Sequence, residues 1–158
     1  MRREFKGILY NEMKSNNKIV VISCDLGYGF FDDIKKDLSN QFITCRATEQ
    51  LAVGMAVGMA DCGFIPIVYS ITPFLLFRPA EWIRNFLHHE GSNVKLLGAG
   101  RDDDYHSDGF THYAGDDKQI MGGFPGVVCY WPEHASELQQ TTKGWLYNGK
   151  PSYLNLKR

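Results

Sequence analysis

Residues 46–70 read RATEQLAVGMAVGMADCGFIPIVYS, and this stretch decides the fold. Its polar start is followed by a long apolar run of small side chains and then by a second, shorter apolar run. The first run, at residues 48–61, has the length of a helix. The second, at residues 65–69, is rich in β-branched side chains and predicts a strand. A helix that leads directly into an apolar strand is typical of proteins with a parallel sheet.

The same alternation continues on both sides of this stretch. Apolar runs predict further strands at residues 19–23, 41–45, 94–97, 127–130 and 153–156. Helices are expected at residues 4–14, 79–89 and 134–147. Most of the runs are continuous rather than alternating, as in strands that are covered on both faces. The sequence therefore predicts an α/β fold, with a mostly parallel six-stranded sheet and helices on both faces.

The predicted helix at residues 48–61 is apolar on every side between Leu51 and Ala60. A helix without a polar face is buried all round. Gly54 and Gly58 share one of its faces, so another backbone can approach closely there. A central core helix would explain this pattern, but a domain of 158 residues covers such a helix more easily with another subunit. We therefore expect an oligomer.

The composition argues against several classes of protein. The net charge of −1 gives no electrostatic reason to expect nucleic acid or an anionic membrane as a partner. No apolar run approaches the roughly 20 residues that span a bilayer, and none follows the basic N-terminus as in a secretory signal. The four cysteines form no CxxC pair, which argues against a zinc knuckle and favours a reducing compartment. A cytoplasmic protein that acts on a small molecule is expected.

Four segments that follow the ends of predicted strands carry much of the unusual chemistry of the sequence. They comprise residues 25–29, 46–50, 70–78 and 98–115. Ligands of open parallel sheets bind beyond the carboxyl ends of the strands. The sequence therefore predicts a site where these four segments meet.

Glu49, Phe74 and Phe77 each have two interpretations. Glu49 could be an ordinary acid at a helix N-terminus, where the dipole favours it by about 0.3–1 kcal/mol. Its apolar neighbours favour instead a buried carboxyl group that shares a proton with a ring nitrogen. Phe74 and Phe77, three residues apart, either fill the core or form an aromatic wall for a flat heterocycle.

The segment at residues 98–115 is rich in Gly, Asp and His, as is typical of a binding loop. His106, Asp108 and His112 could in principle bind a metal ion. Their spacing matches no familiar ligand pattern, so no metal ligand is predicted in this chain.

In their order and spacing, these segments resemble the pyrimidine-binding domain of the transketolase and deoxyxylulose-phosphate synthase family of thiamine diphosphate enzymes. RATEQ at residues 46–50 resembles the family's glutamate segment, and TPFLLF at 72–77 resembles its aromatic loop. DGFTH at residues 108–112 matches its DG-x-TH loop. Asp25-Leu26 and KPSYLNL at 150–156 resemble the end of its first strand and its closing strand. The resemblance covers nearly the whole chain.

The resemblance implies thiamine diphosphate as the cofactor and a role for each site residue. Glu49 would hydrogen-bond the pyrimidine ring and act in catalysis together with His112. Phe74 and Phe77 would line the pyrimidine pocket, and Asp25 would support it. Asp108 and His112 would face the oxygens of the substrate.

The resemblance also implies a partner. Residues 1–158 are expected to form a single pyrimidine-binding domain, without the pyrophosphate-binding and C-terminal domains of the family. The family's magnesium-diphosphate motif, Gly-Asp-Gly followed by a distant Asn, does not occur here. A separate pyrophosphate-domain chain with that motif would then hold the magnesium.

The implied activity is that of one subunit of a split transketolase-like transferase, which moves a ketol unit between sugar-type substrates. The alternatives are a subunit of a thiamine diphosphate-dependent 2-oxoacid decarboxylase and a non-catalytic binding module on the same fold. Trp131-Pro132 stands where transketolases have an Arg before Pro that helps to bind the substrate phosphate. Arg101 is therefore a candidate for contact with a substrate phosphate.

Overall fold

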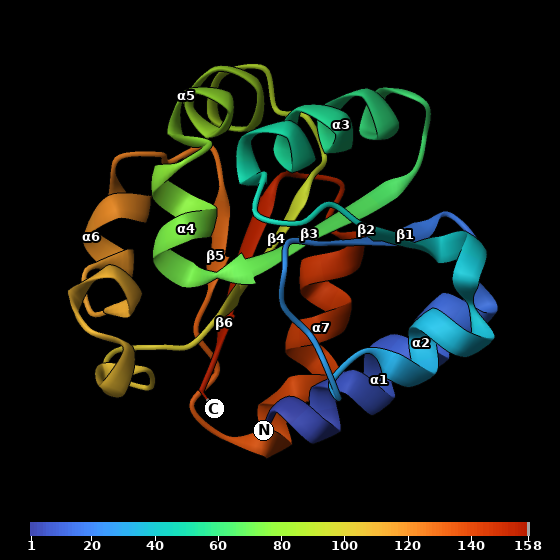
Figure 1. Cartoon of the computed structure of the whole chain (residues 1–158). Helices are drawn as coiled ribbons and strands as arrows, with labels where there is room; N and C mark the ends of the chain where they lie inside the picture. Colours follow the sequence, from blue (N-terminus) through green and yellow to red (C-terminus); the bar gives the residue numbers. More distant parts are fainter. Residues whose placement is uncertain (158) are drawn as a thin grey trace.

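The computed structural model describes residues 1–157, and these residues form a parallel sheet between two layers of helices (Figure 1). In this part of the chain the sheet has six strands in the order β2-β1-β3-β4-β6-β5, and every neighbouring pair is parallel. The strands are β1 (Ile19–Ser23), β2 (Phe42–Thr44), β3 (Ile65–Ile71), β4 (Lys95–Ala99), β5 (Val128–Tyr130) and β6 (Ser152–Leu156). The predicted α/β fold is confirmed, and the predicted strand limits differ from these by two residues at most.

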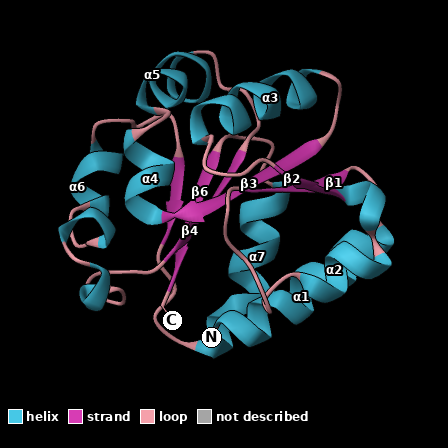
Figure 2. Cartoon of the chain, viewed as in Figure 1, coloured by secondary structure: helices cyan, strands magenta, loops and turns pink. Residues whose placement is uncertain are grey.

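Helices connect the strands on both faces of the sheet (Figure 2). The α-helices are α1 (Arg2–Ser15), α2 (Asp32–Asp37), α3 (Glu49–Asp61), α4 (Thr72–Phe77), α5 (Ala80–Trp82), α6 (Asp117–Gly122) and α7 (Leu138–Tyr147). A π-helical turn, η2 (Ile83–His89), continues α5, and short 3₁₀ turns are η1 (Ser39–Gln41), η3 (His106–Asp108), η4 (Phe110–His112) and η5 (Ala135–Glu137). No helix among the described residues is both long and apolar enough to cross a membrane.

Each face of the sheet has its own hydrophobic core. One core packs α1, α2 and α7 against the strands, and the other packs α3, α4, η2 and α6 against the opposite face. In β4, Leu97 belongs to the first core and Leu96 to the second, because successive side chains of a strand point to opposite faces. This double burial explains why the strands are apolar without alternation.

Helix α4 was not expected from the sequence. The residues after β3 were interpreted as a loop, yet Thr72–Phe77 is helical, with a proline at its first turn. Proline suits that position because its fixed φ fits a helix start and its missing N–H is not needed there. The short helices α2 and α6 were missed as well, since six residues give too little periodicity to detect.

Lys95 lies fully buried at the amino end of β4, the edge opposite to the predicted site. Its ammonium group donates hydrogen bonds to Asn148 Oδ1 at 2.8 Å, to the Lys150 carbonyl at 2.7 Å and to Ser152 Oγ at 3.2 Å. These three acceptors are all neutral. Burial lowers the pKa of Lys95 to about 7, because removal from water disfavours the charged form.

We predict that the free energy of unfolding rises between pH 7 and about pH 8.5. Folded Lys95 releases its proton near pH 7, whereas an unfolded lysine keeps it up to about pH 10.4. The unfolded state therefore binds more protons in this interval, and stability increases with pH by at most about 1.4 kcal/mol per unit. The interval ends at about pH 8.5, because unfolded thiols begin to lose their protons there. Burial raises the pKa of Cys24 and Cys129 to about 12, so the folded thiols keep their protons at higher pH. The folded state then binds more protons at these two residues, which opposes the rise in stability.

The measurement is urea unfolding at constant ionic strength. Lys95→Met should remove the rise, and the exposed Lys36→Met should keep it. A parent protein whose stability is flat across this interval would contradict the prediction.

Candidate functional site

A cavity of about 380 Å³ opens at the carboxyl ends of β1 and β3. The chain runs from β1 outward to β2 and then back across to β3, so this is the point where the strand order reverses. Such switch points are where open α/β sheets bind ligands. The cavity brings together five of the residues that the sequence singled out: Asp25, Glu49, Phe74, Asp108 and His112.

Glu49 is the first residue of α3, and its side chain is 2% exposed. Ser70, near the end of β3, donates its hydroxyl to Glu49 Oε1 at 2.7 Å. Arg78, which follows α4, donates from Nη1 to Glu49 Oε2 at 2.6 Å. Both carboxylate oxygens thus have a partner, as a buried charge requires. An ordinary acid at a helix N-terminus would lie in water, so the burial agrees with the buried carboxyl group of the second interpretation. The sharing of a proton with a ring nitrogen stays a prediction.

Phe74 forms one wall of the cavity. The guanidinium carbon of Arg78 lies 4.0 Å from the centre of its ring, and the ring of His112 meets it edge-on at 5.0 Å. Thr111 Oγ1 lies 3.0 Å from His112 Nδ1. Phe77 is different, because it does not line this cavity and 55% of its side chain is exposed.

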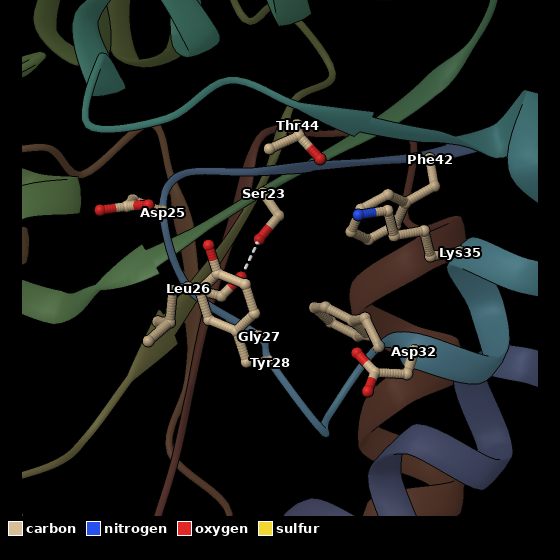
Figure 3. Close-up of a pocket in the computed structure, with 10 residues that line it drawn as sticks. Ser23, Asp25, Leu26, Gly27, Tyr28, Asp32, Lys35, Phe42 and Thr44 are labelled. Atoms are coloured by element: carbon tan, nitrogen blue, oxygen red, sulfur yellow. Dashed lines mark hydrogen bonds between the residues drawn. The ribbon is translucent and has the colours of Figure 1, made fainter.

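Asp25 is in the turn that follows β1 and has a φ of 44°, in the left-handed region that a residue with a side chain seldom adopts. Ser23 Oγ donates to the Leu26 carbonyl at 2.5 Å across this turn (Figure 3). The same turn borders a second cavity of about 50 Å³, which is too small for a heterocycle with substituents. Within this cavity's lining, the Asp25 carboxylate points away from Phe42 (Figure 3). Strained residues of this kind cluster at binding sites.

Arg101 lies away from the cavity, and its side chain is 2% exposed. Its guanidinium donates to Glu133 Oε1 at 2.9 Å and to the carbonyls of Pro132 and Asn155 at 3.1 and 2.5 Å. It therefore ties the end of β4 to the segment after β5 and to β6. The expectation that Arg101 contacts a substrate phosphate is corrected, because the fold itself uses these donors.

Asp117 is a buried carboxylate that the sequence did not single out. Its Oδ2 accepts hydrogen bonds from Trp131 Nε1 at 2.8 Å, Tyr153 OH at 2.9 Å and Asn155 Nδ2 at 2.7 Å. Burial and this carboxylate raise the pKa of Tyr153 well above its ordinary value, so its hydroxyl stays a donor. The single N–H of the Trp131 indole is used in its hydrogen bond to Asp117, so Trp131 belongs to the structural framework and not to the lining of the cavity.

Cys24, Ser70, Arg78 and Tyr105 also line the cavity but were not named as site residues. Burial, together with the nearby Glu49, raises the pKa of Cys24 to about 12, so its thiol stays protonated. Arg78 could have been found from the sequence, because it is the charged residue that ends the uncharged run at residues 70–77. Ser70 gave no such signal. Among the described residues, no group of three His, Cys, Asp or Glu side chains is arranged to hold a metal ion.

Comparison with known proteins gives a family match over the whole chain. The family described as the transketolase, pyrimidine binding domain matches residues 1–158. An apulose-4-phosphate transketolase subunit of Phocaeicola vulgatus is 28% identical over 158 residues, which are 99% of this chain and 51% of that protein. The 6-deoxy-6-sulfo-D-fructose transketolase subunit SqwH of a Clostridium species is 25% identical, over 100% of this chain and 49% of that protein. The chain thus spans about half the length of these curated relatives.

A solved structure agrees with these sequence matches. The structure described as split gene transketolase, inactive beta4 tetramer, superposes with a TM-score of 0.85 at 26% identity. The superposition covers 99% of this chain and 50% of that one.

We predict that Ser70→Ala lowers the free energy of unfolding by about 1.5–3 kcal/mol, the usual range for a hydrogen bond to a charged group. The loss should shrink when Glu49 is already Gln, because the two residues form one interaction. Chemical denaturation of the four members of this double-mutant cycle measures the coupling. Ser136→Ala, at an exposed position, is the control and should change stability by less than about 0.5 kcal/mol. Equal losses in both Glu49 backgrounds would contradict the prediction.

Proposed function

Because the chain belongs to the transketolase pyrimidine-binding domain family, we propose that its cavity receives the aminopyrimidine ring of thiamine diphosphate in a split transketolase. The observation that carries this proposal is the buried Glu49 carboxylate beside the ring of Phe74. The cavity, at about 380 Å³, falls within the usual range of about 300–1,000 Å³ for small-molecule pockets. A flat ring with nitrogen atoms matches both features, since it can stack on the phenylalanine and bond the carboxyl group.

The residues of this chain bind the ring and control a proton on it. Glu49 holds and exchanges a proton at a pyrimidine nitrogen, and Ser70 fixes the other carboxyl oxygen. When bound, the cofactor would supply a carbon nucleophile and an electron sink for the bond that is cleaved in the substrate. Phe74 lines the ring pocket, and Phe77 completes its outer side after assembly.

Three further residues belong to the mouth of the site. Asp108 and His112, from the segment after β4, face the oxygens of the substrate, and His112 takes part in proton transfer. His112 is suited to this because an imidazole ring can both accept and donate a proton. Asp25 supports the cofactor from the turn after β1.

A partner chain supplies the rest of the site. Two of the relatives described above are named as transketolase subunits, and the matched structure is named as a split gene product. An apolar face on α3 and α5 supports such a contact. Leu51 there is 63% exposed and, with Met55 and Trp82, borders a hollow of about 370 Å³. The partner carries the Gly-Asp-Gly and distant Asn motif and holds the magnesium with the diphosphate.

The reaction that we propose is the transfer of a ketol unit between sugar-type substrates. The relatives are named for apulose 4-phosphate and for 6-deoxy-6-sulfo-D-fructose, and each of those sugars carries an anionic group. In this chain the indole N–H of Trp131 is paired with Asp117, so it offers no contact for such a group.

The four cysteines are free thiols, which agrees with a cytoplasmic location.

We predict that Glu49→Gln slows deuterium exchange at C2 of bound thiamine diphosphate by about 10²–10⁴-fold. Gln keeps the shape of Glu49 and one hydrogen-bond acceptor oxygen but cannot exchange the ring proton. The measurement uses the complex with the pyrophosphate-domain partner, with cofactor saturation checked separately. Glu90→Gln, at an exposed position, is the control and should exchange like the parent. Exchange as fast in Glu49→Gln as in the parent would contradict the proposed role.

We also predict that Leu51→Asp weakens binding of the partner chain by at least about tenfold, which corresponds to about 1.4 kcal/mol. The new carboxylate would be buried in the contact, whereas in the free chain it stays in water and changes stability little. Sedimentation velocity with the partner measures the affinity. Asp61→Asn also changes the charge of α3 by one unit and should leave binding unchanged. Undiminished affinity in Leu51→Asp would place the contact elsewhere.

A further inference from the structure

Arg78 makes the two contacts that we assign to the aminopyrimidine ring. Its flat guanidinium lies over the Phe74 ring, with 4.0 Å between the guanidinium carbon and the ring centre. The same group donates an N–H to Glu49 Oε2 at 2.6 Å. In the proposed function, the cofactor ring is likewise a planar group that stacks on Phe74 and forms a hydrogen bond with Glu49.

We propose that Arg78 is an internal stand-in for the aminopyrimidine and competes with the cofactor for Glu49. This inference rests on the proposed function. Glu49 is 2% exposed, and its Oε1 already accepts a hydrogen bond from Ser70. An incoming ring must therefore take the place that Arg78 holds at Oε2 and over Phe74.

The position of Arg78 in the chain allows it to leave. It follows the last residue of α4, and 44% of its side chain is exposed. Arg78 is not part of β3 or α3, which hold Ser70 and Glu49. Opening of the pair is therefore a change of side-chain rotamer, a movement that exposed side chains make within picoseconds to nanoseconds when they are unpaired.

The pairing has opposite effects on the free chain and on cofactor binding. Without cofactor, Arg78 keeps the buried Glu49 carboxylate from being left unpaired, which would be strongly destabilising. With cofactor, the pair must first open, so the apparent affinity is reduced by the fraction of molecules in which it is open. Arg78 thus stabilises the fold of the cofactor-free chain and lowers its apparent affinity for the cofactor.

The test is a titration of thiamine diphosphate, with magnesium, into the complex with the partner chain, followed by calorimetry. We expect Arg78→Ala and Arg78→Met to bind the cofactor several-fold more tightly than the parent, while the unfolding midpoint of each free variant falls. Arg78→Met keeps a long apolar side chain over Phe74, so it replaces Arg78→Ala if that variant does not fold. Arg84→Ala removes the same charge from an exposed position, where Nη1 donates to the Asn85 side chain, and it should leave both values unchanged.

The two variants separate this inference from the proposed function. Unchanged or weaker cofactor binding in both Arg78 variants, with a parent complex that binds normally, would overturn the stand-in and leave the proposed function in place. A parent complex that binds no thiamine diphosphate would overturn the proposed function and this inference together.

Discussion

The site depends on one constraint: a carboxylate with 2% exposure at the start of an apolar helix. A buried charge of this kind is costly unless it is paired and hydrogen-bonded. Ser70 and Arg78 meet that requirement from the end of β3 and from beyond α4, so the β3–α4 connection is fixed relative to α3. The same connection places Phe74 beside Glu49. The elements around the cavity are therefore held together by the group that we propose for the chemistry.

Much of the fold could be predicted from the sequence, for a clear physical reason. Strands such as β1 and β4 are buried on both faces, so their apolar runs stand out without alternation. The cavity could be anticipated because parallel strands bring their carboxyl ends to one edge, where Asp25, Glu49 and Asp108 follow different strands. Helix α4 was missed because proline, which stands in its first turn, is also typical of loops.

Pairwise contacts could not be predicted. Arg101 and Arg78 are both arginines in segments that follow predicted strands, yet one is paired with Glu133 in the framework and the other lies in the cavity. That difference depends on which acceptors the fold brings within reach, and sequence spacing does not carry this information. Phe77 shows the same limit, because its helix turns it outward although Phe74 faces the cavity.

The central claim is that Glu49 of this chain binds the aminopyrimidine ring in a site completed by the partner. A crystal structure of the assembled complex with thiamine diphosphate and magnesium tests it most directly. The account predicts a Glu49 carboxylate oxygen within about 3.2 Å of a pyrimidine ring nitrogen, with Arg78 turned away from that oxygen. A bound cofactor whose ring lies elsewhere, while Glu49 stays paired with Arg78 and Ser70, would contradict the account.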